Sequence, residues 1–141
     1  MFVWITRRLE GRLYEWALAA PTLASGIHLA MHPEALSNSA FHRLGNVLDV
    51  GSVSVLLILC GVLRLIALAV NGYSDVIGPV ARCVCAALSA FLWSEIAYAL
   101  YEYGLSRGVI SPMWWFWASF TLAEVFVCYR AGMDVRRFVR W

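Results

Sequence analysis

The sequence predicts an all-α fold: a polytopic membrane protein with four transmembrane helices in a small bundle. Of its 141 residues, 62% are hydrophobic and only 14% are charged, whereas about a quarter of the residues in a soluble domain are charged. Four apolar stretches each approach the roughly 20 residues that a helix needs to cross a bilayer. The arginines also gather on one side of these stretches, as basic residues do in membrane proteins.

The order of the elements follows from the apolar windows and the breaks between them. Residues 1–12 place Phe2, Trp4 and Ile5 beside three arginines, which is typical of a short helix lying in the membrane interface. The later breaks contain residues that end helices: Pro33, Gly72, Pro79 and Gly104. The pattern predicts a transmembrane domain over 13–129 and a basic cytoplasmic tail over 130–141. Its four spans are expected at about 13–31, 47–70, 80–103 and 109–129.

The arginines also predict the orientation. All eleven basic residues are Arg, and four spans place nine of them on the side that holds both termini. These nine are Arg7, Arg8, Arg12, Arg64, Arg82, Arg130, Arg136, Arg137 and Arg140. Because basic residues favour the cytoplasmic side, we expect a bacterial inner-membrane protein with cytoplasmic N- and C-termini. The "MWWFW" run and the tyrosines that end the third span agree, since such rings favour the outer interface.

Arg64 stands out because it lies inside an apolar run, "CGVLRLIALAVNG". Its depth matches that of Glu124, which lies six residues before Arg130 on the same side. An unpaired charge in hydrocarbon is costly, so such residues turn inward and find partners. We therefore predict a structural ion pair between Arg64 and Glu124. Glu15 with Arg12, or Arg82 with a cytoplasmic carboxylate, are weaker versions of the same idea.

Glu95 lies farther out, with no basic residue obviously at its level. His28 is the nearest candidate in depth, so Glu95 and His28 form a possible polar or proton-carrying site. The alternative is that hydroxyl groups of Ser or Tyr satisfy Glu95. Intramembrane carboxyl groups often serve function, and both interpretations stay open at this point.

Metal, cofactor and catalytic motifs are weak. His28 and His32 are one helical turn apart and are the best metal candidates, but a loop with Pro33 follows, and no metal or cofactor is expected. The four cysteines have no zinc or redox spacing, so they are interpreted as small apolar filler. No nucleophile–base or phosphate-loop motif occurs, which predicts a protein that is not an enzyme.

Small residues recur at helical spacing and predict close helix contacts, either within one subunit or between copies. The sets are Ala17, Ala20 and Ala24, then Ala86 with Ala90, and Cys85 with Ser89. The expected partners are the lipid bilayer and a protein in the membrane, which includes a second copy of the chain. Nucleic acid is excluded, because the arginines lie at span ends and form no basic stripe.

Several segments together resemble a recurring group of proteins. They include "GVLRLIALAVNG", "GPVARCVCAALSAFLW" and "TLAEVFVCYRAGMDVRR". The chain resembles small, uncharacterised four-span membrane proteins encoded by tailed phages and prophages of proteobacteria. The resemblance implies a phage or prophage accessory protein acting through a membrane partner in genome entry, exclusion or host-membrane modification. It brings no catalytic residues. A holin-type pore former and a small accessory subunit of a transporter or respiratory complex are the alternatives.

Overall fold

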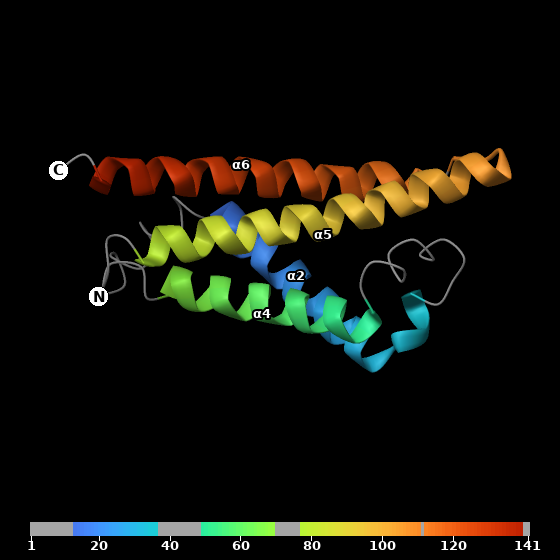
Figure 1. Cartoon of the computed structure of the whole chain (residues 1–141), viewed down its shortest axis with the longest axis horizontal. Coiled ribbons are helices and arrows are strands. Elements are labelled where there is room, and N and C mark those ends of the chain that lie inside the picture. The colour runs from blue at the N-terminus through green and yellow to red at the C-terminus, as the bar shows by residue number, and fades with distance from the viewer. Residues whose placement is uncertain (1–12, 37–48, 70–76, 111, 140–141) are drawn as a thin grey trace.

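The computed structural model describes residues 13–36, 49–69, 77–110 and 112–139. In these ranges the chain is all-α, with four helices packed as a bundle (Figure 1). The elements are α2 (Leu13–Met31), the 3-10 helix η1 (Pro33–Leu36), α4 (Val50–Ala69), α5 (Ile77–Arg107) and α6 (Met113–Val139). The predicted interfacial helix over 1–12 lies outside the described residues.

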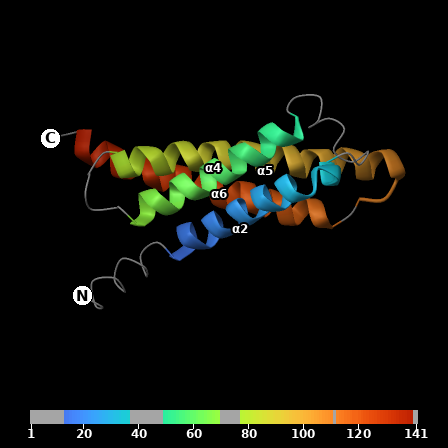
Figure 2. The same ribbon diagram turned by 90° about the horizontal axis from the view of Figure 1, so that it is seen from below.

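The helices pack in chain order: α2 lies on α4, α4 on α5, and α5 on α6. We call the end where α4 ends and α5 begins the charged end, and the end where α5 turns into α6 the aromatic end. At 1.5 Å per residue, the 31 residues of α5 span about 46 Å, against about 30 Å for the 20 residues of α4. The α5–α6 pair therefore projects past α2 and α4 at the aromatic end (Figures 1 and 2).

The first helix has the predicted bounds, but the ends of the last two helices differ from the prediction. Gly104 lies inside α5, and the helix ends three residues later at Arg107. Gly108 follows with a φ of 69°, a left-handed conformation that glycine adopts readily. The amide of Gly108 donates to Leu105 O at 3.1 Å, and that of Val109 donates to Gly104 O at 3.0 Å. This is the Schellman arrangement that satisfies the last carbonyls of a helix.

The segment predicted as a basic tail continues helix α6 up to Val139. Helix α6 begins at Met113 and runs on beyond Tyr129, where the fourth span was expected to end. Between Tyr129 and Val139 the sequence has no proline, and its one glycine, Gly132, is tolerated within the helix. The apolar window ends at Tyr129, but no helix-breaking residue ends the helix at that position.

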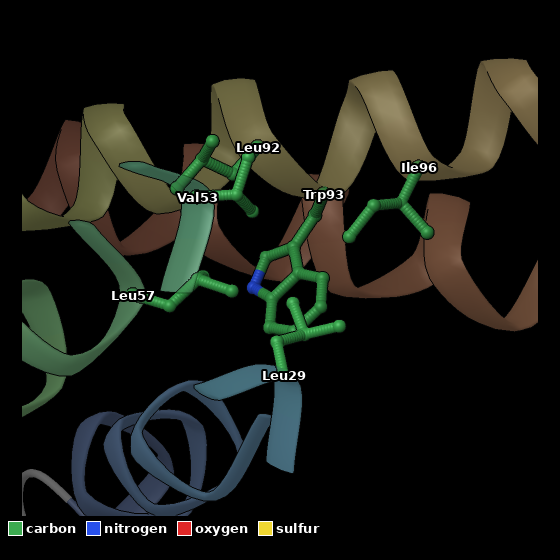
Figure 3. Close-up of a cluster of buried hydrophobic side chains, with 6 residues drawn as sticks. All are labelled: Leu29, Val53, Leu57, Leu92, Trp93 and Ile96. Atoms are coloured by element: carbon green, nitrogen blue, oxygen red, sulfur yellow. The ribbon is translucent and has the colours of Figure 1, made fainter. Parts of the chain in front are cut away.

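The apolar core lies toward the aromatic end and is built around Trp93 of α5. A cluster of buried residues surrounds it (Figure 3): Leu29, Val53, Leu57, Leu92 and Ile96. The Trp93 ring stacks on that of Trp117 from α6, with ring centroids 5.0 Å apart. Side chains from all four helices thus converge on one indole.

Glycine allows α2 and α4 to approach each other closely. A Cβ atom on Gly26 would lie 2.7 Å from the backbone nitrogen of Ile58, and one on Gly61 would lie 2.7 Å from Leu23 Cβ. Contacts this short are sterically forbidden, so only glycine fits at these two positions. Small residues at a helix interface have this effect in membrane proteins.

Within one chain, the predicted small-residue seam is present on α5 and absent on α2, where a contact between copies stays a prediction. Ala86, Ala90, Cys85 and Ser89 are all buried within the bundle. Ala17, Ala20 and Ala24 are exposed. The face of α2 that packs inward carries Ala19, Thr22, Gly26 and Leu29 instead. Two sets of small residues share this helix, and their spacing alone does not say which of them faces inward.

Two of the four helices, α4 and α5, are long and apolar enough to cross a bilayer. All four helices nevertheless expose large apolar side chains. Examples from each helix are Ile27, Leu59, Phe91 and Phe126.

Candidate functional site: a buried charge network

The main polar feature of the bundle is a set of five charged residues, which we call the charge network. Its members are Glu15, Arg64, Arg82, Glu124 and Asp134. Four of them are buried, and the side chain of Asp134 is 33% exposed. Burial of a charge is costly unless the charge is paired, so the partners of each residue decide what the network does.

Arg64 of α4 and Glu124 of α6 form one ion pair, as the sequence predicts. Arg64 Nη1 donates to both carboxylate oxygens of Glu124 at 2.7 Å. The side chains are 1% and 0% exposed. Arg64 Nε and Nη2 have no hydrogen-bond acceptor among the described residues. The pair therefore connects the two helices through a single nitrogen.

Arg82 of α5 holds two carboxylates from different helices. Its Nη1 donates to both carboxylate oxygens of Glu15 at 3.0 Å, and its Nη2 donates to Asp134 at 3.1 Å. The sequence suggests a cytoplasmic carboxylate for Arg82, and the structure shows a contact between Arg82 and Asp134 of α6. The contact with Glu15 was not predicted, because Glu15 was assigned to Arg12, which lies outside the described residues. The sequence did contain one indication of this contact: Glu15 and Arg82 lie at similar distances from the starts of their predicted spans.

The network joins all four helices. Arg82 connects α5 to α2 and α6, and Arg64 connects α4 to α6. Beside it, Arg130 of α6 lies over the ring of Tyr14 from α2, at 5.1 Å from the ring centroid. Helices α2 and α6 share few other contacts, so Arg82 is an important part of what holds them in place.

The network occupies two levels. Glu124 lies ten residues before Asp134 on α6 and ten residues after Trp114, which places it about 15 Å from either residue along the helix. The Arg64–Glu124 pair therefore lies near the middle of this helix, and Arg82 with its two carboxylates lies at the charged end. The sequence had placed Glu124 closer to that end.

Glu95 and His28 are not brought together. The ring of His28 stacks on that of His32, with centroids 4.8 Å apart, and His28 is exposed. Glu95 is partly buried, and no described residue forms a hydrogen bond or ion pair with its carboxylate. The predicted relay therefore has no direct contact in this structure, because a similar depth on two helices does not guarantee facing sides.

The histidines at the end of α2 have a carboxylate neighbour. His32 Nδ1 lies 3.2 Å from Glu34 Oε1. Hydrogen bonds from a backbone amide and from His32 lower the pKa of Glu34, which is fully exposed. Within the described residues, no three side chains of His, Cys, Asp or Glu gather as a metal site would require.

The cysteines are more organised than the filler role implies. All four are free thiols, and Cys60 and Cys85 are buried. Cys83 of α5 and Cys128 of α6 are half-buried, with sulfur atoms 3.4 Å apart. The two residues are 45 positions apart in the sequence, so their contact could not be found from local spacing.

A groove of about 500 Å³ lies between α5 and α6 on the side of the aromatic end. Its lining is mostly apolar and aromatic, with the rings of Tyr101 and Trp114 in contact at 5.2 Å between centroids. Two small residues, Ala97 and Ala118, leave the space open.

Fold and site together define a class: an all-α four-helix bundle whose interior is held by ion pairs and whose exterior is rich in apolar side chains. Compared with known proteins, the chain matches no family, no curated protein and no solved structure.

Proposed function

We propose that all four helices cross a bacterial cytoplasmic membrane, and that the protein acts through a protein partner in that membrane rather than by catalysis. The observation that carries this proposal is the distribution of charge. Four charged side chains lie in the interior with their partners, while every helix exposes large apolar side chains, most of them on α4, α5 and α6. This distribution suits a solvent of lipid tails, in which charges turn inward and pair.

The dimensions of the bundle support the same proposal. Trp114 and Asp134 are 20 positions apart on helix α6, or about 30 Å, which is the thickness of a hydrocarbon core. One boundary carries Glu15 and Asp134 of the charge network, and the other carries Tyr101 and Trp114. Aromatic rings favour such an interface.

Helices α2 and α6 are less apolar than ordinary membrane spans because they contain carboxylates, but these carboxylates are paired. Helix α2 contains Glu15, and α6 contains Glu124 and Asp134, each of which lowers the mean hydropathy of its helix. Since all three carboxylates meet an arginine of the bundle, their cost in lipid is smaller than a sum over single residues suggests.

Reporter fusions test the four-span topology. We expect alkaline phosphatase to be active when fused after Ser37 and inactive after Trp141, and a fluorescent cytoplasmic reporter to give the reverse pattern. Eight of the eleven arginines would then lie in or near the cytoplasm and Arg64 within the membrane, a bias that the positive-inside rule favours. A fusion after Trp141 that is active only in the periplasm would contradict the proposal.

For the biological process, we propose a phage or prophage accessory role in genome entry, exclusion or host-membrane modification. The resemblance of segments such as "GVLRLIALAVNG" to small phage membrane proteins supports it. Expression in a host strain followed by challenge with tailed phages tests this role. We expect reduced infection without lysis. Lysis at a defined time after induction would favour a holin instead, and unchanged infection by every phage tested would contradict the exclusion role.

A further inference from the structure

One face of α5 is exposed along most of the helix and has the spacing of a helix–helix seam. Its members recur at alternating intervals of four and three residues, as in a heptad pattern. We call them the outer face of α5: Val84, Leu88, Phe91, Glu95, Tyr98 and Glu102. All are exposed except Glu95, which is partly buried. None of these six residues belongs to the buried cluster around Trp93.

Glu95 is the unusual member of this face. The other carboxylates of the spanning segments, in Glu15, Glu124 and Asp134, each meet an arginine of the same chain. Glu95 lies 13 residues after Arg82, or about 20 Å along the helix, and has no partner among the described residues. An isolated carboxylate at that depth of a bilayer is unfavourable and marks a place where a partner is needed.

We propose that the outer face of α5 binds a transmembrane helix of a partner protein, and that a basic residue of that helix pairs with Glu95. The proposal rests on the proposed function, because it requires α5 to cross the membrane. The groove between α5 and α6 borders this face at Tyr98. Side chains of the partner helix can pack into this groove. Apolar contacts then hold the two helices together, and the ion pair with Glu95 fixes the position of the partner helix along α5.

The charge of the partner follows from complementarity, and it argues against a second copy as the occupant. Arg64 and Arg82, the arginines within the described bundle interior, are already paired with carboxylates of their own chain. Arg107 lies at the aromatic end over the ring of Tyr103, 5.3 Å from its centroid. A second copy therefore offers no unpaired described arginine at the depth of Glu95.

A synthetic peptide can stand in for the partner helix. The probe is a Leu/Ala transmembrane peptide of about 20 residues with one arginine placed at the depth of Glu95. Matched peptides carry leucine at that position, or the arginine in the other half. Full-length protein and peptide are reconstituted in vesicles, and their association is measured by energy transfer. We expect the matched arginine peptide to bind about tenfold more tightly than the leucine peptide, a typical effect of an interhelical polar contact.

Two variants of the protein decide the assignment. Glu95→Leu should abolish the preference for arginine, whereas Glu102→Gln, on the same face but at the aromatic end, should keep it. Equal binding of both peptides to the wild type, or a preference that survives Glu95→Leu, would overturn the proposal. So would association between copies that requires Glu95, because it would identify a second copy as the occupant.

Failure of the underlying topology can be recognised separately. Cysteine placed at position 95 in a variant lacking the four native cysteines should react slowly with a membrane-impermeant maleimide if α5 spans the bilayer. Rapid labelling would show that position 95 is in water and would count against the proposed function itself. Slow labelling without arginine preference would count against the docking proposal alone.

Discussion

The guanidinium of Arg64 meets Glu124 through one nitrogen, Nη1, at 2.7 Å from both carboxylate oxygens. With exposures of 1% and 0%, neither charge reaches solvent within the bundle. Removal of one member of such a pair leaves the other stranded in low dielectric, which costs more than the pair itself contributes. The two residues should therefore be strongly coupled in stability.

Double substitution tests this coupling. Arg64→Leu and Glu124→Leu should each lower the free energy of unfolding by about 3–5 kcal/mol, measured by thermal unfolding in detergent. The double variant should recover much of that loss, because two neutral side chains leave no buried unpaired ion. If the loss in the double variant equals the sum of the two single losses, Arg64 and Glu124 contribute independently to the free energy of unfolding, and the predicted coupling is absent.

Asp49 caps the start of α4, one residue before the helix begins. The Ser52 hydroxyl and then the Ser52 amide donate hydrogen bonds to its carboxylate, and they lower its pKa. A lowered pKa means that this cap stabilises the fold fully above the unfolded pKa of about 3.9. The stabilisation is lost as the pH falls through the lower folded-state pKa.

The corresponding variant is Asp49→Asn, which can still accept hydrogen bonds at the cap but cannot ionise. We expect its melting temperature to fall less than that of the wild type between pH 5 and roughly pH 3. The comparison is between the two proteins, since other carboxylates titrate in both. An identical decline in both proteins would mean that the ionised cap contributes nothing.

At the scale of the elements, α2 and α4 form the closest pair because glycines lie where they cross. Gly61→Ala would place a methyl group 2.9 Å from the backbone nitrogen and Cα of Leu23, so the helices would have to separate. We expect a loss of about 1–3 kcal/mol in the free energy of unfolding, measured in detergent.

Gly132→Ala is the matched control for that variant. A Cβ at Gly132, within α6, meets nothing within 4 Å, so the same chemical change there should be neutral or stabilising by up to about 1 kcal/mol. Equal losses in both variants would mean that the effect comes from glycine in a helix and not from the crossing of α2 and α4.

The elements also indicate what the sequence could and could not reveal. Apolar windows located all four helices, and the bounds of α2 agree with the structure. The windows missed the ends of α5 and α6, because helix ends depend on backbone breaks such as Gly108 and not on where apolarity stops. Depth arguments found Arg64 with Glu124, but they could not tell which face of a helix turns inward. For that reason the contact of Glu15 with Arg82 was missed, and Glu95 was matched with His28.

At the scale of the whole molecule, the bundle combines an apolar core around Trp93 with four buried charged residues and many exposed large apolar side chains. The charged residues that lower the apolarity of α2 and α6 are the same residues that join those helices to the others. The span test evaluates each helix alone and recognises two. If α2 and α6 cross the membrane as proposed, their suitability for lipid depends on ion pairs that exist only in the assembled bundle.

The pairing of Glu15 with Arg82 also has a consequence for synthesis. The two residues are 67 positions apart, and at 5–20 residues per second a ribosome needs roughly 3 to 13 s to make the intervening chain. For that interval α2 exists with its carboxylate unneutralised and its partner not yet made. If α2 crosses the membrane as proposed, it has reason to stay beside the insertion machinery, or at the bilayer surface, until α5 emerges. The synthesis of Arg82 would then set the time at which α2 can insert with its carboxylate paired.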